Sequence, residues 1–342
     1  MSTLVLTDPK LLDHDPGPGH AESPARLDAI MAELGRAPRA GVAIETPRAA
    51  TTAEIEAVHS AAYRAKLAAL DGHYADLDPD TALSPGSWEA ATLAAGAAVG
   101  AVEAVMTGAA DNAFALVRPP GHHARPDRAM GFCLLNNAAI AAESARRAGA
   151  ERVLIVDWDV HHGNGTQEIF EARDDVLYMS VHQFPFYPGT GAAGEVGVGA
   201  GRGATVNCAL PGGQTDADYG VVFHDLFLPV GRAFAPDLII VSAGFDAHAR
   251  DPLAGMRVSE RGFAAMGSAL AELAAGACGG KLVLLLEGGY DLAALAASVR
   301  ASLEVLTGRR EDFPKGAGTA AIDAVLSTRA ALRAAGRIVS PT

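Results

Sequence analysis

Short apolar runs alternate with stretches of helical periodicity along most of this chain. The run Arg152–Val156 is almost entirely Val, Leu and Ile, which is typical of a strand buried on both faces of a parallel sheet. Similar runs predict strands at about Leu4–Thr7, Val42–Glu45, Ala113–Val117, Val153–Asp157, Val176–Val181, Thr205–Leu210, Leu238–Ser242 and Leu282–Glu287.

Helical patterns fall between several of these strands. One helix should begin at Ser23-Pro24, with Ser as the cap and Pro at the first helical position. Another should begin at Thr51, where Thr51 and Glu54 have the spacing of a capping box. The remaining helices are expected roughly over Trp88–Met106, Asn137–Ala148, Asp218–Phe234, Glu260–Ala275 and Leu292–Leu306.

This alternation predicts an α/β fold with one doubly wound, mostly parallel, eight-stranded sheet flanked by helices. We find no internal repeat and no low-complexity linker, so residues 1–342 are expected to form a single domain. The Gly-rich stretch Gly189–Gly203 joins two strand candidates and is interpreted as a functional loop.

Reactive residues follow four of the predicted strands. Doubly wound sheets bind ligands outside the carboxyl ends of their strands, so these residues should meet at one edge. The segments are Arg118–His123, Asp157–Gly165, Ala243–Asp246 and Glu287–Tyr290. Four such coincidences favour a catalytic site over chance packing.

The segment after Val153–Val156 has the spacing of a metal site. In an extended backbone alternate residues point the same way, so Asp159 and His161 can converge on one point. Carboxylate oxygen and imidazole nitrogen are natural ligands of a divalent cation, above all zinc. With Asp246 as a third ligand, open positions remain for water and substrate, as in catalytic zinc sites. The alternative is an acidic strand end whose histidines only cap or pack.

Composition narrows the partners. The chain has 342 residues, of which 49% are hydrophobic and 20% charged, as in a soluble globular protein. Its net charge of −13 argues against direct binding of nucleic acid and suits a cationic or neutral substrate, although it could serve solubility alone. Cys133, Cys208 and Cys278 are widely spaced and odd in number, which indicates reduced thiols and a cytoplasmic location.

Neither a signal peptide nor a membrane span is expected. Met1–Lys10 lacks a basic region followed by an apolar stretch. The Ala-rich run Ala90–Met106 is interrupted by Gly96, Gly100 and Glu103, and is interpreted as a packed helix.

Taken together, the motifs resemble the histone deacetylase superfamily, in particular its class II-like bacterial deacetylases and acetylpolyamine amidohydrolases. The resemblance extends from His20–Leu27 to about Gly308 and leaves a C-terminal helical tail, residues 309–342, outside it. The matching segments are Arg118–His123, Gly131-Phe132-Cys133, Asn136-Asn137, Asp157–Gln167, Tyr187–Gly191, Gly244-Phe245-Asp246, Asp251-Pro252-Leu253 and Glu287–Tyr290. The resemblance also implies that Asp159, His161 and Asp246 hold one catalytic zinc ion.

The resemblance implies roles for the other polar residues of these segments. His122 and His123 would be the general base and general acid, functions that suit imidazole near neutral pH. His122 would pair with Asp157, and His123 with Asn164, where many relatives have Asp. Tyr290 would donate to the oxyanion that develops during hydrolysis, and a Tyr at this position favours real activity.

The resemblance further implies a narrow acyl-lysine tunnel and a potassium site. Gly131, Phe132, Tyr187 and Leu253 would line the tunnel, and eukaryotic polyamine-specific relatives carry Glu at the position of Leu253. Ser180, with the backbone of Asp157, Asp159, His161 and Val181, would bind a structural potassium ion.

Residues at the tunnel rim are less certain from sequence. Asp78 and Asp80 are candidates to contact a charged substrate, although a solvated acidic turn explains them better. His14 and His20 are further rim candidates, and the other histidines are expected to be structural. His248 could suggest a binuclear arginase-like site, but we find no bridging carboxylates for it.

We therefore expect zinc-dependent hydrolysis of an N-acetyl amide of the acetyl-lysine type to acetate and a free amine. The first alternative is an acetylpolyamine or other small-amide amidohydrolase that uses the same residues. The second is a ligand-binding relative that has lost turnover. Oligomers are possible in any of these cases.

Overall fold

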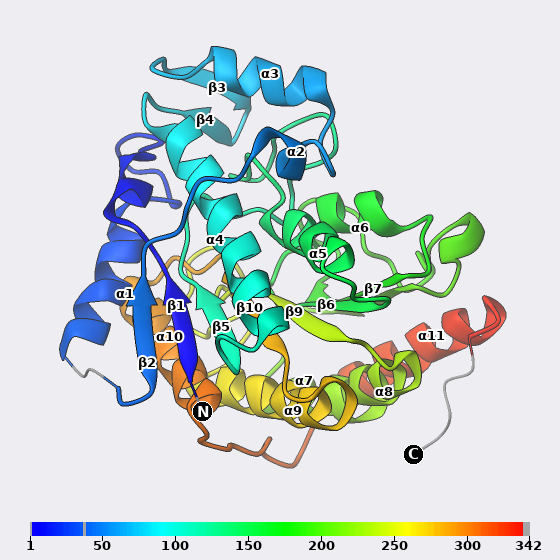
Figure 1. Ribbon diagram of the computed structural model, residues 1–342. Coiled ribbons are helices and arrows are strands. Elements are labelled where there is room, and N and C mark those ends of the chain that lie inside the picture. The colour runs from blue at the N-terminus through cyan, green and yellow to red at the C-terminus, as the bar shows by residue number, and fades with distance from the viewer. Residues whose placement is uncertain (1, 37–38, 338–342) are drawn as a thin grey trace.

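The computed structural model describes residues 2–36 and 39–337, and its centre is an eight-stranded sheet in which every neighbouring pair is parallel (Figure 1). The strands are β1 (Thr3–Leu6), β2 (Val42–Glu45), β5 (Asn112–Ala115), β6 (Val153–Asp157), β7 (Val176–Gln183), β8 (Thr205–Leu210), β9 (Leu238–Ala243) and β10 (Leu282–Leu286). All eight predicted strands and the predicted fold class are confirmed. A separate antiparallel hairpin, β3 (Ala75–Asp78) and β4 (Thr81–Leu83), was not expected.

The order of strands across the sheet is β2-β1-β5-β10-β9-β6-β7-β8. Strands β5, β10, β9 and β6 are therefore consecutive neighbours, although they are far apart in the sequence. These four strands are the ones that the reactive segments follow. Because they run parallel, their carboxyl ends deliver those segments to one continuous stretch of the sheet edge.

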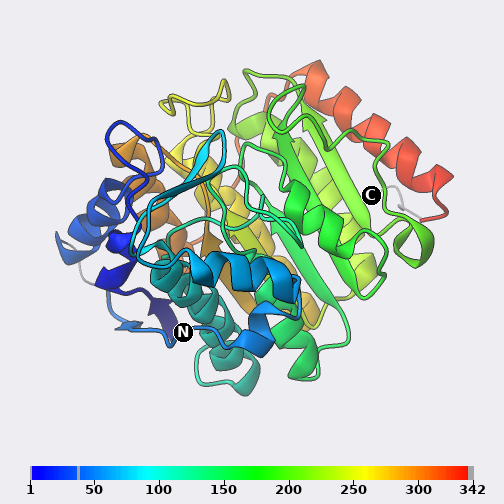
Figure 2. The same cartoon turned by 90° about the horizontal axis from the view of Figure 1, so that it is seen from above.

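Helices cover both faces of the sheet (Figures 1 and 2). On one face α4 packs against β5 and α5. On the other face α9 contacts β9 and β10, α10 packs against α9, and α1 packs against α10. The helices are α1 (Ala25–Arg36), α2 (Thr52–Ile55), α3 (Ala61–Ala69), α4 (Ser87–Thr107), α5 (Asn137–Arg147), α6 (Asn164–Phe170), α7 (Asp216–Val222), α8 (Leu228–Phe234), α9 (Glu260–Cys278), α10 (Leu292–Leu306) and α11 (Thr319–Ala334). Two 3₁₀ turns, η1 (Pro9–Asp13) and η2 (Gly199–Gly201), complete the set.

The predicted helix starts are close to those observed. Thr51 and Glu54 form the expected capping box at the start of α2. The helix expected from Ser23-Pro24 begins at Ala25, and the Ser23 carbonyl accepts from Arg26 N at 3.1 Å.

The single helix expected over Asp218–Phe234 is interrupted. Between α7 and α8 lies a π-helical turn, η3 (Phe223–Phe227), where Leu228 N donates to the Phe223 carbonyl. Pro229 at the start of α8 has no N–H to donate to the carbonyl four residues earlier, that of Asp225. That carbonyl instead accepts from Arg329 Nη1 of α11 at 3.4 Å. The interruption thus coincides with a contact to a helix a hundred residues away.

The Ala-rich run Ala90–Met106 lies within α4. By length and composition alone α4 could cross a membrane, yet 72% of its most apolar window is buried inside the fold. Small side chains let it pack closely on β5 and α5. Cys133, Cys208 and Cys278 are buried and unpaired.

Helix α11 covers the edge strand β8. Thr328 Oγ1 donates to the Asn207 carbonyl at 2.7 Å, and α11 also contacts α7. The tail predicted at 309–342 is therefore helical over Thr319–Ala334, and residues 338–342 lie outside the described part of the chain.

Candidate active site

Three potential metal ligands meet at the edge of the sheet. Asp159 and His161 follow β6, and Asp246 follows the neighbouring β9. Their ligand atoms lie within 4.8 Å of one another, and His161 Nδ1 is 3.1 Å from both Asp159 Oδ1 and Asp246 Oδ2. The structure thus brings together the three residues that the sequence singled out.

Backbone N–H groups orient the two carboxylates. Asp159 Oδ2 accepts from Gly288 N, and Asp246 Oδ1 accepts from Val160 N, each at 2.8 Å. A Cβ atom on Gly288 would lie 2.2 Å from Asp246 Oδ2 and 2.6 Å from Asp159 Oδ2. Only glycine therefore allows the loop after β10 to pass this close to both carboxylates.

The donor set fits a divalent cation. Asp159 and Asp246 are 1% and 0% exposed, so two carboxylates lie side by side with almost no water to screen them. Burial and the neighbouring Asp159 carboxylate raise the pKa of Asp246 above its usual range. A cation would offset this repulsion, and two carboxylates with one imidazole are suitable zinc ligands. A second group, His122, Cys133 and Glu287, has comparable spacing, but each member already has a hydrogen-bond partner: Glu287 accepts from Gly121 N and His122 N, His122 pairs with Asp157, and Cys133 donates to the Gly131 carbonyl.

The adjacent His122 and His123 have different partners. His122 Nδ1 is 3.0 Å from Asp157 Oδ2, and His123 Nδ1 is 2.8 Å from Asn164 Oδ1. Both partner oxygens are acceptors, so each Nδ1 carries the hydrogen when the ring is neutral. The His123 Nε2 lone pair is therefore free to accept a proton from the pocket.

Electrostatics separate the two rings further. Burial disfavours charge on His122, but Asp157, Asp159 and Glu287 outweigh it and raise the His122 pKa well above its ordinary value. Burial, followed by repulsion from His122 and His161, holds the pKa of His123 well below the ordinary value. At neutral pH one ring is a cation and the other a neutral base.

Asp157 lies behind this pair. Its Oδ2 accepts from the Tyr178 hydroxyl at 2.9 Å as well as from His122, and its Oδ1 accepts from Asp159 N at 3.2 Å. In the sheet Asp157 is the direct partner of Ser180 on β7. Ser180 is buried, and its hydroxyl is 2.8 Å from His182 Nδ1.

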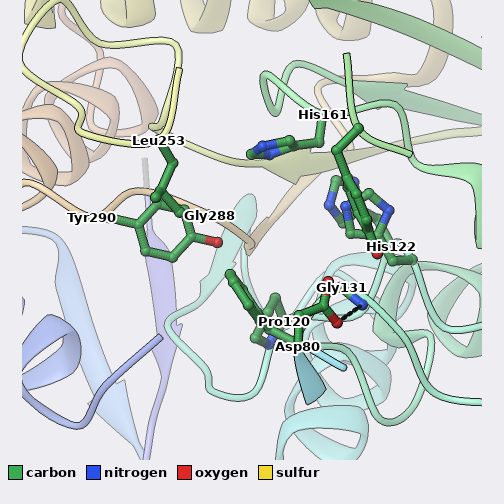
Figure 3. A pocket seen from close by; sticks show the side chains of 11 residues that line it. Asp80, Pro120, His122, Gly131, His161, Leu253, Gly288 and Tyr290 are labelled. Atoms are coloured by element: carbon green, nitrogen blue, oxygen red, sulfur yellow. Dashed lines mark hydrogen bonds between the residues drawn. The ribbon is translucent and has the colours of Figure 1, made fainter. Parts of the chain in front are cut away.

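Tyr290 faces the histidines from the loop between β10 and α10. Figure 3 shows its hydroxyl directed into the pocket, across from His122 and His161. Its backbone N donates to Asp251 Oδ2 at 2.7 Å, and the Arg26 guanidinium lies 5.0 Å from the ring centroid. Burial raises the pKa of Tyr290 well above its ordinary value, so the phenol keeps its proton and can donate it in a hydrogen bond.

A narrow pocket leads to these groups. It is lined by Asp80, Pro120, His122, His123, Gly131, Phe132, His161, Tyr187, Leu253, Gly288 and Tyr290, which include all four residues expected to form a substrate tunnel. The rings of Phe132 and Tyr290 meet edge to face at 5.9 Å, and Tyr187 meets His123 in the same way at 5.2 Å. A Cβ on Gly131 would lie 2.4 Å from the His123 ring, so this glycine makes room for the imidazole.

The rim candidates divide into two groups. Asp80 lines the pocket, and its Oδ1 accepts from Gly131 N at 3.1 Å and from Thr81 Oγ1 at 2.7 Å (Figure 3). Asp78, two residues away on β3, is not among the lining residues. His20 packs edge-on against Phe132 with ring centroids 4.7 Å apart, which places it behind the pocket wall.

His14 is not a rim residue. It is 1% exposed and lies in a buried ion cluster, with Nδ1 2.7 Å from Ser87 Oγ and Nε2 3.3 Å from Glu22 Oε2. His14 is one of the rim candidates named from the sequence. Glu22, however, draws it inward.

The buried cluster around Glu22 had no role in the sequence analysis. Glu22 accepts two hydrogen bonds from Arg118, from Nε and Nη2 at 2.7 Å each, and one from Arg26 at 3.0 Å. Arg26 in turn donates Nε to the Gly289 carbonyl at 2.7 Å and Nη2 to the Glu287 carbonyl at 2.5 Å. The cluster therefore holds the backbone of the loop that carries Tyr290. The i,i+4 spacing of Glu22 and Arg26 was the one sequence signal that could have indicated it.

Glu287 supports the opposite side of the pocket. Its Oε2 accepts from Gly121 N at 2.6 Å and from His122 N at 3.1 Å, while Oε1 accepts from Ser242 Oγ at 3.1 Å. Burial raises the pKa of Glu287 to about 7. The carboxylate fixes the backbone that carries the His pair, although the sequence indicated only that Glu287 belongs to a motif.

Comparisons with known proteins agree with this arrangement. A family model described as the histone deacetylase domain matches residues 20–306. The chain is 45% identical over 326 residues to "Histone deacetylase 15" of Arabidopsis thaliana, covering 91% of this chain but 58% of that protein. It is 44% identical over 301 residues to "Histone deacetylase-like amidohydrolase" of Pseudomonas aeruginosa, covering 85% of this chain and 78% of that protein.

A solved structure is equally similar. The crystal structure of the HDA15 HD domain matches with a TM-score of 0.92 and 43% identity, over 97% of this chain and 94% of that one. The likeness therefore extends over nearly the whole fold, beyond the residues of the pocket.

Proposed function

The chain belongs to the histone deacetylase family, and from this premise we propose that it hydrolyses N-acetyl amides to acetate and a free amine. The observation that carries the proposal is the convergence of three kinds of group on one pocket. These are the Asp159–His161–Asp246 donor set, the neutral His123 base and the Tyr290 phenol.

We propose that Asp159, His161 and Asp246 hold one zinc ion. When bound, zinc would polarise the amide carbonyl and lower the pKa of water in the pocket. We also propose that Ser180, with the backbone of Asp157, Asp159, His161 and Val181, holds a structural potassium ion. The burial of Ser180 and its place beside Asp157 in the sheet support this.

His123 acts as the proton carrier. Its Nε2 accepts the proton of the attacking water as the new C–O bond forms, and gives that proton to the amine nitrogen as the C–N bond breaks. Asn164 keeps Nδ1 as the protonated nitrogen, so Nε2 is available for both transfers. The charged His122 next to it, with ring centroids 4.0 Å apart, stabilises negative charge that develops in the pocket.

Tyr290 acts on the other side of the scissile bond. Its hydroxyl faces the histidines and retains its proton, so it can donate a hydrogen bond to the oxygen that becomes negative in the transition state. Asp251, the Arg26 cluster and Gly288 hold the loop in this place, so the donor is in position before the substrate enters.

The pocket walls favour a linear methylene chain. Phe132, Tyr187, Leu253 and Pro120 form mostly apolar walls, and such walls suit the side chain of acetyl-lysine. A second ammonium deep in this tube would lose its water without gaining a partner, at a cost of several kcal/mol. Asp80 at the pocket is the residue best placed to contact charged or N–H groups of a substrate.

The choice of substrate can be tested with Leu253. We expect the wild type to have a higher kcat/KM for an acetyl-lysine peptide than for acetylspermidine, and Leu253→Glu to shift the preference toward acetylspermidine because a carboxylate would pair with the second ammonium. Leu292→Glu, at an exposed position at the start of α10, is the matched control and should leave the ratio unchanged. A wild type that prefers acetylpolyamines by about tenfold or more, a difference of roughly 1.4 kcal/mol, would contradict the tunnel argument.

Two alternatives remain distinguishable by the same assay. An amidohydrolase for acetylpolyamines or other small amides is supported by the name of the Pseudomonas relative, and it would turn over the small substrates best. A binding protein without turnover would hydrolyse none of them, which the presence of His122, His123 and Tyr290 in one pocket argues against.

A further inference from the structure

The loop between β7 and β8 forms one wall of the pocket. Phe186 stacks on His161, with ring centroids 5.5 Å apart and planes inclined by 19°. Tyr187 meets the edges of His123 and His161 at 5.2 Å and 6.1 Å. Tyr187 is 37% exposed, so packing against neighbours covers it only in part. Something other than burial of the Tyr187 ring must therefore fix this wall.

Glu195 lies in this loop and binds both the loop's own backbone and α6. Its Oε1 accepts from Gly191 N and Ala192 N, both at 3.0 Å, and its Oε2 accepts from Gln167 Nε2 at 2.7 Å. One carboxylate therefore connects the loop to α6. Hydrogen bonds from Gln167 and from these two N–H groups outweigh the effect of burial and keep the pKa of Glu195 below its usual value.

The carboxylate also determines the direction of the hydrogen bonds beyond it. Since it only accepts, Gln167 must turn its amide N toward Glu195 and its Oε1 toward His162 Nε2, 2.9 Å away. His162 Nε2 therefore donates, which leaves Nδ1 to accept from the Thr190 hydroxyl at 2.8 Å. Thr190 is next to Gly191, so the circuit returns to the loop from which it started.

Two further contacts keep this circuit in one orientation. Asn207 Nδ2 donates to Gln167 Oε1 at 2.7 Å, so a flipped Gln167 amide would place donor against donor. His182 Nε2 lies 2.9 Å from the Gly191 carbonyl, to which it donates. A Cβ on Gly191 would approach His182 Nε2 to 2.4 Å, so the loop is held against the sheet here as closely as its backbone allows.

We propose that Glu195 is a positioning residue for substrate binding: its carboxylate closes the Gln167–His162–Thr190 circuit and so fixes the loop that places Tyr187 in the pocket wall and Phe186 against His161. Glu195 itself does not line the pocket, so it acts through the loop. The inference rests on the proposed function, because it assigns this wall to the methylene chain of an acetylated amine. Loss of the carboxylate should therefore weaken substrate binding more than the chemical step.

The test compares three variants in the full chain. Glu195→Gln removes the charge and places a donor against Gln167, while Glu195→Asp keeps the charge one methylene shorter. Glu171→Gln is the matched control. It removes a half-buried carboxylate that repels Glu195 but keeps the backbone hydrogen bond of Glu171 to the loop, in which its carbonyl accepts from Val198 N at 2.7 Å.

Two measurements separate the loop from the reaction. Hydrogen exchange over residues 184–198 reports whether the loop is held, and it requires no activity. Steady-state kinetics with an acetyl-lysine peptide report KM and kcat. For Glu195→Gln we expect faster exchange confined to this loop and a KM raised about tenfold or more, with kcat within about threefold of wild type. Glu195→Asp should lie between this variant and wild type, and Glu171→Gln should match wild type.

Each other result would overturn the inference. Unchanged loop exchange or an unchanged KM in Glu195→Gln would show that the carboxylate does not position the wall. Faster exchange throughout the molecule, or a loss confined to kcat, would show a general structural role or a chemical one. A wild type that hydrolyses no acetylated amine would instead refute the proposed function. In that case the exchange data would still decide whether Glu195 holds the loop.

Discussion

At the scale of single residues, the site depends on small differences between similar groups. His122 and His123 are neighbours with the same side chain, yet one pairs with a carboxylate and the other with an amide oxygen. An amide cannot balance a positive charge, so Asn164 leaves His123 a neutral base while Asp157 favours the His122 cation. The division of labour between two identical imidazoles thus depends on their hydrogen-bond partners as well as on burial and on the repulsion from His122 and His161 that lower the His123 pKa.

The metal assignment makes a direct prediction at this scale. Asp246→Ala removes one of two buried carboxylates, so the remaining donors should no longer hold a divalent ion firmly. We expect near-stoichiometric metal in purified wild type and little in the variant, measured by elemental analysis. Asp323→Ala, on the exposed side of α11, should keep its metal. If Asp246→Ala retains the full complement, Asp246 is not a ligand.

Tyr290 gives a second prediction. Tyr290→Phe removes only the hydroxyl that faces the histidines, so the fold and the metal content should be unchanged while kcat falls by about 10²-fold or more. The control is Tyr219→Phe, which removes a buried phenol hydroxyl that has no hydrogen-bond partner among residues 2–36 and 39–337 and does not line the pocket. Near wild-type kcat in Tyr290→Phe would mean that the phenol is only structural.

At the scale of elements, the catalytic loops are held by parts of the chain that are far away in sequence. The loop between β10 and α10 rests on α1, since Arg26 donates to the carbonyls of Gly289 and Glu287 and lies under the Tyr290 ring. Glu22 and Arg118 fix Arg26 in turn. A helix near the N-terminus therefore determines where a phenol 264 positions later points.

Arg26→Lys tests this support. Lysine keeps the charge for Glu22 but cannot donate to both carbonyls at once, because the planar fork of donors is lost. We expect the free energy of unfolding to fall by about 2 kcal/mol, as for lost hydrogen bonds of a charged group, and kcat to fall with it. Chemical denaturation and steady-state kinetics measure the two effects. Arg300→Lys, at a half-exposed ion pair with Glu33, should change neither appreciably. Wild-type kcat in Arg26→Lys would show that the loop does not depend on α1.

At the scale of the whole molecule, one edge of a continuous parallel sheet gathers the chemistry. Strands β5, β10, β9 and β6 are adjacent, so four segments spread over more than 160 residues meet within one pocket. Both faces of the sheet are covered by helices, which buries the groups that support the site. Several of these buried groups titrate, and this connects the stability of the fold to pH.

The buried His59 makes one contribution to that dependence, and its sign follows from its lowered pKa. Its Nδ1 is 2.9 Å from the Arg125 carbonyl, its Nε2 accepts from Asn136 N at 2.9 Å, and burial lowers its pKa from 6.5 to about 4. Between these two pKa values His59 therefore binds a proton in the unfolded chain but stays neutral in the folded chain. The contribution of His59 to the free energy of unfolding is therefore complete above pH 6.5 and declines by about 3 kcal/mol as the pH falls toward 4.

The measurement is urea denaturation between pH 8 and pH 4.5. On acidification the free energy of unfolding of wild type should fall relative to that of His59→Gln, which can keep neutral contacts at this position. His73→Gln, at an exposed position, should follow wild type. At still lower pH a second group, Glu22, should also lose its stabilising contribution. Burial favours the neutral form of Glu22, but Arg118, His14 and Arg26 hold its folded pKa well below the ordinary value, so its stabilising contribution is lost as that carboxylate is protonated. Parallel curves for wild type and His59→Gln would contradict the assignment.

Local patterns in the sequence were sufficient to predict much of the secondary structure of this protein. The eight strands of the sheet are recognisable because each is a short apolar run, and the α2 cap because its two residues are three positions apart. The positions of Asp159 and His161 followed from the two-residue period of an extended chain. The motifs were sufficient to identify the family, and the resemblance to that family gave the four residues expected to form the tunnel, all of which line the pocket.

Only the tertiary structure decided which distant groups support that pocket. No periodicity connects Arg26 with Gly289, Glu287 with Gly121, or Glu195 with Gln167, because these contacts depend on strand order and on how loops return across the sheet edge. The same holds for the π-helical turn at Phe223–Phe227, where a missing N–H is compensated by α11. A local pattern records which face of an element is buried, but the partner of a buried charge is chosen only when the elements pack together.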